Sequence, residues 1–161
     1  MSAQILVAAV AVIVSVGAFG STRRRDVVVR RAELLRAYTN DFYADAAMSA
    51  LFLDLEYGRT SYELVRKTSH ETSLVRLLDL LNSVGHSARV GIIRRRDLLD
   101  TTLGYACVVA WGSAVVTEFL LEVDEVDARE RLDGQGFAHF RWLAATLHNT
   151  YQPTAEWRAS R

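Results

Sequence analysis

The residue pair with the clearest chemical potential in this chain is His70 followed by Glu71, which is how the zinc-peptidase motif His-Glu-x-x-His begins. In that motif a second histidine lies four residues after the first, and both imidazoles bind zinc while the glutamate acts as a base. Here Leu74 occupies the position of the second histidine. Zinc-peptidase chemistry is therefore excluded. Ser69, His70 and Glu71 remain candidates either for a polar functional site or for the capped start of a helix.

The histidines are too far apart in the sequence to form a metal site on one helix. Their separations are 16, 53 and 9 residues, so no two of them are three or four residues apart on a shared helix face. The sequence therefore predicts no metal and no other cofactor, although a site assembled from histidines of different helices stays open. The four histidines are His70, His86, His139 and His148.

The only cysteine, Cys107, lies in a strongly apolar run and is expected to be a small buried side chain. Burial raises the pKa of a thiol and keeps it unreactive, so Cys107 is a poor candidate for a nucleophile. A single cysteine also excludes an intrachain disulfide. The glycines at 134 and 136 do not follow a predicted strand, so no phosphate-binding loop is indicated. No catalytic residue is predicted.

A membrane anchor is predicted at the N-terminus. Residues 2–20 carry no charged side chain, and a helix of this length spans about 28 Å, close to the roughly 30 Å hydrocarbon core of a bilayer. A cleaved secretory signal is the main alternative, but it normally has a positive charge before the apolar region and a small-x-small cleavage site after it. Neither is clear here. We therefore expect residues 1–22 to form one transmembrane helix.

The charges beside this segment predict its orientation. No side chain before it is charged, whereas residues 21–36 hold six arginines against Asp26 and Glu33, a net charge of +4. Positive flanks stay in the cytoplasm, so the N-terminus should lie outside the inner (plasma) membrane and the rest of the chain inside. Residues 23–42 should form a basic helical neck that contacts anionic lipid headgroups. The expected contact residues are Arg23, Arg24, Arg25, Arg30 and Arg31.

An all-α bundle of four or five helices is predicted for residues 43–148, with a flexible tail at 149–161. No segment alternates polar and apolar residues in the manner of a strand, and apolar residues recur at helical spacing instead. Residues 59–68 are expected to be a connector. The expected helices are 44–57, which Gly58 ends, a Leu-rich helix that Ser69 caps and that fades near Gly85 or Gly91, a long helix 98–123 that Asp97 caps, and a last helix that starts near Phe137. The expected buried stripes are Met48, Leu51, Phe52 and Leu55 in the first of these helices and Leu74, Leu77, Leu78 and Leu81 in the second. The acidic stretch from Glu118 onward is interpreted as a solvated helix end and loop.

The apolar run at 103–117 permits two interpretations. It is 15 residues long, which is short of the about 20 residues that a membrane helix needs, and Asp100 and Glu118 close its two ends. A core helix of the domain is the favoured interpretation. A second membrane span is the alternative, and it would place the C-terminal part of the chain outside the cell.

The order of these features resembles a bacterial family of small membrane-anchored proteins catalogued as domain of unknown function 4760. Where we expect that family to have a second acidic residue after the Ser-His-Glu sequence, this chain has Thr72. The resemblance implies an all-α, membrane-anchored domain and brings no established activity. It is carried by the N-terminal span, the arginine-rich neck, the helix end Leu55-Glu56-Tyr57-Gly58, the Ser-His-Glu start of the Leu-rich stretch 69–85, and the later Gly91-Ile92-Ile93.

Two classes of function follow from the sequence. The leading hypothesis is a non-enzymatic single-pass membrane protein whose cytoplasmic helical domain is a protein-interaction or scaffolding module for another protein or for itself. The alternative is a membrane-bound enzyme with a polar site around Ser69, His70 and Glu71. Nucleic acid is disfavoured because residues 37–161 carry 13 basic and 17 acidic groups. The arginines at 94–96 are interpreted as a solvated lead-in to a helix.

Overall fold

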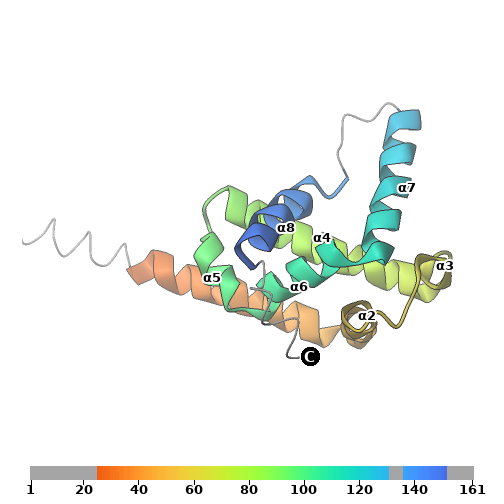
Figure 1. Ribbon diagram of the computed structural model, residues 1–161. Helices are drawn as coiled ribbons and strands as arrows, with labels where there is room; N and C mark the ends of the chain where they lie inside the picture. Colours follow the sequence, from red (N-terminus) through yellow and green to blue (C-terminus); the bar gives the residue numbers. More distant parts are fainter. Residues whose placement is uncertain (1–24, 131–135, 152–161) are drawn as a thin grey trace, which may run out of the picture. The chain divides into compact units, whose positions relative to one another are not determined.

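The computed structural model describes residues 25–130 and 136–151 (Figure 1). The chain divides into two compact units, Met1–Ala37 and Tyr38–Arg161. The predicted anchor at 1–22 lies outside the described residues, as does most of the predicted tail. Of that tail, residues 149–151 belong to the last helix.

In the first unit, residues 25–37 are helical. Three consecutive valines, Val27, Val28 and Val29, are exposed on this helix. The second unit begins with helical residues 38–44.

The second unit is all-α over its described residues, which confirms the predicted fold class. It has more helices than the four or five expected, because short helices of four and five residues, α3 and α5, form where we expected a connector and the lead-in to a longer helix. In chain order the helices are α2 (Ala46–Glu56), α3 (Tyr62–Val65), α4 (Ser69–Arg89), α5 (Arg95–Leu99), α6 (Thr102–Gly112), α7 (Ala114–Glu130) and α8 (Ala138–Tyr151).

Helix α2 has the boundaries and the buried face that its sequence predicts. The Asp45 side chain accepts a hydrogen bond from the Met48 backbone N–H at 3.0 Å and so satisfies a donor of the first turn. After the helix, Gly58 adopts a φ of +62°, a conformation that favours glycine. The apolar stripe faces the core as expected, with Met48, Leu51, Phe52 and Leu55 all buried.

Helix α4 differs from its prediction at its start and agrees with one of the two predicted ends. Thr68, rather than Ser69, is the N-cap, because the Thr68 hydroxyl accepts a hydrogen bond from the His70 N–H at 3.2 Å. Of the two predicted ends, Gly85 and Gly91, the second is confirmed: the helix continues through Gly85 to Arg89, and the backbone turns at Gly91 with a φ of +80°. Glycine within a helix costs stability, but Gly85 permits a close helix contact that compensates for this cost.

The core of the second unit forms around α4. The predicted Leu-rich stripe is confirmed, since Leu74, Leu77, Leu78 and Leu81 have no exposed surface. Helix α8 lies across the second half of α4, and α2 packs against the same helix (Figure 1). Phe140, Leu143, Ala144 and Leu147 of α8 are buried against this centre.

The predicted single helix 98–123 is wrong, because the segment is divided between α5, α6 and α7. Thr101 caps α6 and accepts from the Gly104 N–H at 3.2 Å, so Asp97 is not the cap of this long segment. A second break follows at Ser113, whose ψ of 129° is extended and ends α6. Neither break contains proline, and the tertiary packing of α6 rather than a local helix breaker accounts for them.

The break at Ser113 also decides how the apolar run 103–117 is arranged. In α6 the residues Leu103, Ala106, Cys107 and Ala110 have no exposed surface, which supports the core-helix interpretation. Among the described residues no single helix combines the length and the apolar composition that crossing a bilayer requires. Helices α6 and α7 reach these values only as a pair, and the pair is bent by 73°.

Candidate functional site

The candidate residues Ser69, His70 and Glu71 lie in the first turn of α4. Ser69 and His70 are exposed, and Glu71 is half-buried. The Glu71 carboxylate accepts a hydrogen bond from the backbone N–H of Lys67, the residue before the N-cap Thr68. Glu71 and the Thr68 hydroxyl thus bond to backbone groups on the two sides of the helix start, as in a capping box. This arrangement favours the structural role over the enzymatic one for Glu71.

The arginines predicted to contact lipid are only partly described. Arg23 and Arg24 lie outside the described residues, Arg25 and Arg30 are exposed, and Arg31 is buried. The second arginine cluster, at 94–96, is exposed as predicted. Arg95 has its guanidinium carbon 5.0 Å from the centroid of the Trp142 ring, so it also contributes a cation–π contact to α8.

Cys107 is buried in α6, as predicted, and burial raises the pKa of its thiol to about 12. At neutral pH such a thiol is almost entirely protonated, and the thiolate is the nucleophilic form. Cys107 is therefore part of the core rather than a reactive group.

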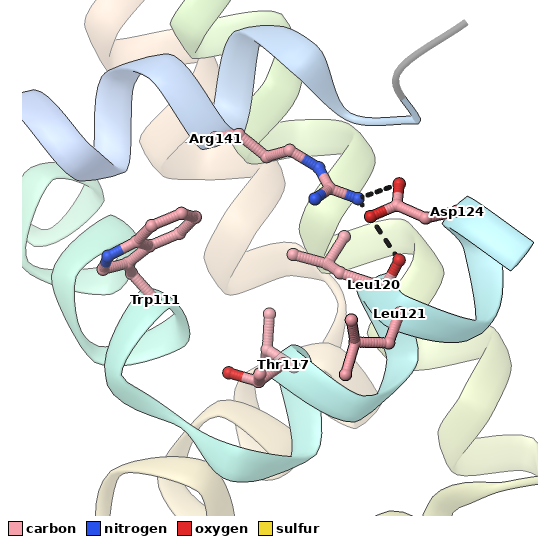
Figure 2. Close-up of a pocket in the computed structure, with 7 residues that line it drawn as sticks. Trp111, Thr117, Leu120, Leu121, Asp124 and Arg141 are labelled. Carbon is pink, nitrogen blue, oxygen red and sulfur yellow. Dashed lines mark hydrogen bonds and ion pairs between the residues drawn. The ribbon is translucent and has the colours of Figure 1, made fainter.

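A pocket of about 300 Å³ opens between α6, α7 and α8 (Figure 2). The Trp111 ring of α6 lies on one side, and Leu120 and Leu121 of α7 lie on the other. Trp111 is held by an edge-to-face contact with Phe140, with ring centroids 6.2 Å apart. Most of the lining is apolar, and the polar groups are Thr117, Asp124 and Arg141. This composition is typical of a binding surface for an apolar side chain.

Arg141 closes one end of the pocket and ties α8 to α7 (Figure 2). Its guanidinium donates to the Asp124 carboxylate at 2.7 Å and to the Leu120 carbonyl at 3.3 Å. Its Nε donates to the Gly136 carbonyl at 2.9 Å. Because all three acceptors are satisfied by one side chain, the beginning of α8 and the middle of α7 are held in a defined spacing.

A second polar cluster fixes α7 to α3. The Tyr62 hydroxyl donates to the Glu122 carboxylate at 2.5 Å, and Arg66 donates to the other oxygen of the same carboxylate at 2.7 Å. Burial, and then the hydrogen bond to Glu122, raise the pKa of Tyr62 to about 12. The same hydrogen bond, together with Arg66, lowers the pKa of Glu122. The proton therefore stays on the tyrosine and the charge on the glutamate across neutral pH.

This cluster predicts a specific loss of stability at alkaline pH. Because the Tyr62 pKa is raised from 10.0 to about 12 in the folded state, its contribution is complete below pH 10 and is lost as the pH rises toward 12. The wild type should lose stability relative to Tyr62→Phe across that interval, while the difference between them stays constant from pH 7 to 9. Urea unfolding of both proteins at each pH measures this. If the difference in unfolding free energy between the two proteins stayed constant up to pH 12, the hydrogen bond between Tyr62 and Glu122 would be contradicted.

Beyond these two clusters α7 extends away from the other helices of the second unit (Figure 1). All of its buried residues, Val115, Val116, Phe119 and Leu120, lie in its first half. From residue 121 to residue 130 no side chain is buried. Leu121 is 59% exposed at the edge of the pocket, and Val126 is 42% exposed on another side of the helix.

This pocket was not predicted from the sequence. The acidic stretch from Glu118 onward was expected to form a solvated helix end and loop, whereas the structure continues α7 to Glu130. A usable signal was present in α8, where Arg141 stands between Phe140 and Trp142 in an otherwise apolar stripe. A charged residue at the edge of a buried helix face needs a partner, and that partner, Asp124, lies 17 residues away in the sequence.

The comparisons with known proteins leave the chain without a demonstrated relative. No protein-family model matches it, no curated protein matches it, and no solved structure matches it. The class that the fold and the pocket define is an all-helical domain with a mainly apolar pocket on its surface. The resemblance to domain of unknown function 4760 stays a prediction from the sequence.

Proposed function

We propose that this chain is a single-pass protein of the bacterial inner membrane whose helical domain is a protein-interaction module in the cytoplasm. The observation that carries the proposal is the mainly apolar pocket between α6, α7 and α8, at whose edge Leu121 is 59% exposed. An apolar hollow with an exposed leucine at its edge is typical of a surface that binds an apolar group of a partner. The pocket beside Leu121 offers space for one of the partner's apolar side chains.

The charge of α7 indicates the chemistry of the partner. The helix carries six acidic residues and one basic residue, Arg129. Such a surface favours a segment with basic side chains, because complementary charge guides association and excludes acidic competitors. We therefore expect an amphipathic helix that combines basic and apolar residues, supplied by another protein or by a second copy of this chain.

The interaction surface can be tested by photocrosslinking in cells. A photoreactive amino acid at position 121 should give a discrete adduct of higher mass, whereas the same amino acid at position 53 should not. Leu53 is a matched control because it is also an exposed leucine, 47% exposed against 59%, on the different helix α2. Equal adducts at both positions, or none at position 121, would contradict the proposed surface.

A second measurement separates this function from the enzymatic alternative. Leu121→Glu should weaken binding of the crosslinked partner at least tenfold, since it puts a charge into the apolar contact. His70→Ala should leave that binding unchanged, because His70 is exposed at the start of α4 and outside the pocket. Loss of the cellular function in a stable His70→Ala protein, with partner binding intact, would favour the enzyme instead.

The membrane orientation gives an independent prediction. The uncharged N-terminus and the net charge of +4 over residues 21–36 support an outside N-terminus and a cytoplasmic domain. A reporter that is active only in the cytoplasm should be active when fused after Arg161, and one that is active only outside should be inactive there. The reverse pattern would contradict the single span and would favour a second span that includes residues 103–117.

A further inference from the structure

The structure brings together two histidines that are 53 residues apart in the sequence. His86 lies on α4 and His139 lies on α8, and their Nδ1 and Nε2 atoms are 3.3 Å apart. The ring centroids are 4.8 Å apart and the ring planes are inclined by 64°. Two rings joined by a straight N–H···N bond of this length would have centroids farther apart, so the contact departs from a straight hydrogen bond.

We propose that His86 and His139 form a binding site for a zinc ion. Zinc binds imidazole nitrogens at about 2.0–2.1 Å in a tetrahedral arrangement, which places two such nitrogens roughly 3.3 Å from each other. The two histidines already have this spacing. An ion bound between them would replace this contact without a change in the distance between the two nitrogens.

The backbone around His139 is held in place by the same face of α4 that carries His86. The Asn82 side-chain oxygen accepts hydrogen bonds from the His139 and Phe140 N–H groups, both at 3.0 Å. A Cβ on Gly85 would lie 2.4 Å from the His139 carbonyl oxygen, so the two backbones touch at this point. Residues 82, 85 and 86 are spaced as i, i+3 and i+4, and therefore share one face of the helix. The site is preorganised in consequence.

The surroundings define what kind of site this is. His86 is exposed, so an ion can enter from solvent. Within the described ranges no group of three or more histidine, cysteine or acidic side chains is placed to hold a metal, so water completes the coordination. The His139 Nδ1 is buried and has no hydrogen-bond partner. When zinc binds Nε2, the proton lies on Nδ1, and in most zinc sites this N–H donates to a carboxylate or carbonyl oxygen. His139 lacks such an acceptor, so the site should bind zinc more weakly than a complete zinc site.

Zinc binding to this pair should stabilise the packing of α8 on α4 and should depend on both histidines. The full-length protein, purified in mild detergent without a polyhistidine tag, is titrated with zinc chloride by calorimetry and by thermal unfolding. We expect about one zinc per chain and a melting temperature about 5 °C or more higher at saturation, reversed by a chelator. His86→Gln and His139→Gln should both abolish these effects. The matched controls His70→Gln and His148→Gln should retain them.

His86→Gln is the decisive variant, because His86 is exposed and its replacement does not threaten the core. Glutamine can still form a hydrogen bond with His139, so a stabilisation that persists in this variant would overturn the proposal. Absence of zinc binding to the folded wild type at millimolar zinc would overturn it as well. The experiment is independent of partner binding, since the pocket on α7 contains neither histidine.

Discussion

Leu78→Ala should lower the free energy of unfolding by about 2–5 kcal/mol, the range for a buried leucine cut back to alanine. Leu78 lies in the middle of α4 and has no exposed surface. The lost methyl groups leave a cavity that α2 and α8 cannot collapse into without disturbing their own contacts with α4. For a domain of this size the melting temperature should fall by roughly 10 °C. Thermal unfolding followed by circular dichroism measures this.

The control for this prediction is Arg129→Ala on α7. Arg129 is exposed and its only described partner is Glu125, at 3.4 Å across one helical turn. Such surface pairs contribute little, so the change in stability should stay within about 0.5 kcal/mol. A comparable loss in both variants would mean that the buried face of α4 is assigned incorrectly.

Gly85→Ala should destabilise the domain by about 1–3 kcal/mol, although alanine favours helix formation over glycine. The added methyl group would lie 2.4 Å from the His139 carbonyl oxygen and 2.6 Å from the His139 carbonyl carbon. Both are backbone atoms, and the hydrogen bonds that the His139 and Phe140 N–H groups donate to Asn82 keep the first turn of α8 where it is. The two helices would have to separate, which loses contacts along their whole crossing. Chemical unfolding of the variant measures the loss.

Gly112→Ala is the matched control, because Gly112 is also in a helix and a Cβ there would meet nothing within 4 Å. This substitution should be neutral or should stabilise by up to about 1 kcal/mol through helix propensity. Opposite signs for the two glycine variants identify the α4–α8 contact as the cause. Equal effects would contradict that contact.

Sequence reasoning succeeded where local periodicity decides the structure. The stripes of α2 and α4 were predicted residue by residue, because an apolar residue every three or four positions leaves one face that must be buried. The turn at Gly58 was predicted for a similar reason, since glycine tolerates the positive φ that ends a helix.

The division of residues 98–123 was not predictable in this way. Thr101 and Ser113 are compatible with a helix interior, and the breaks there follow from how α6 fits between α2, α4 and α8. The Cβ position of Gly104 lies 2.0 Å from the Leu98 carbonyl oxygen, so glycine permits the tight reversal between α5 and α6. Only the folded chain brings these groups together.

The residues of the pocket and of the histidine pair were still harder to predict, because contacts between distant parts of the sequence bring them together. Arg141 and Asp124 belong to different helices, as do His86 and His139. No spacing rule for a single helix can detect either pair, because each partner lies on a separately predicted element. The predicted Ser69, His70 and Glu71 were adjacent in sequence and therefore visible, but their position at a helix start gives them a simpler structural role.

The burial of Cys107 makes the chain well suited to site-specific labelling. Its thiol is inaccessible and its pKa is about 12, so a maleimide or a spin label will leave it unmodified in the folded protein. Two new cysteines, one at Leu121 on α7 and one at Leu53 on α2, would then be the reactive positions without any change to the native core. The distance between labels at these two positions would report directly whether α7 keeps its direction when a partner arrives.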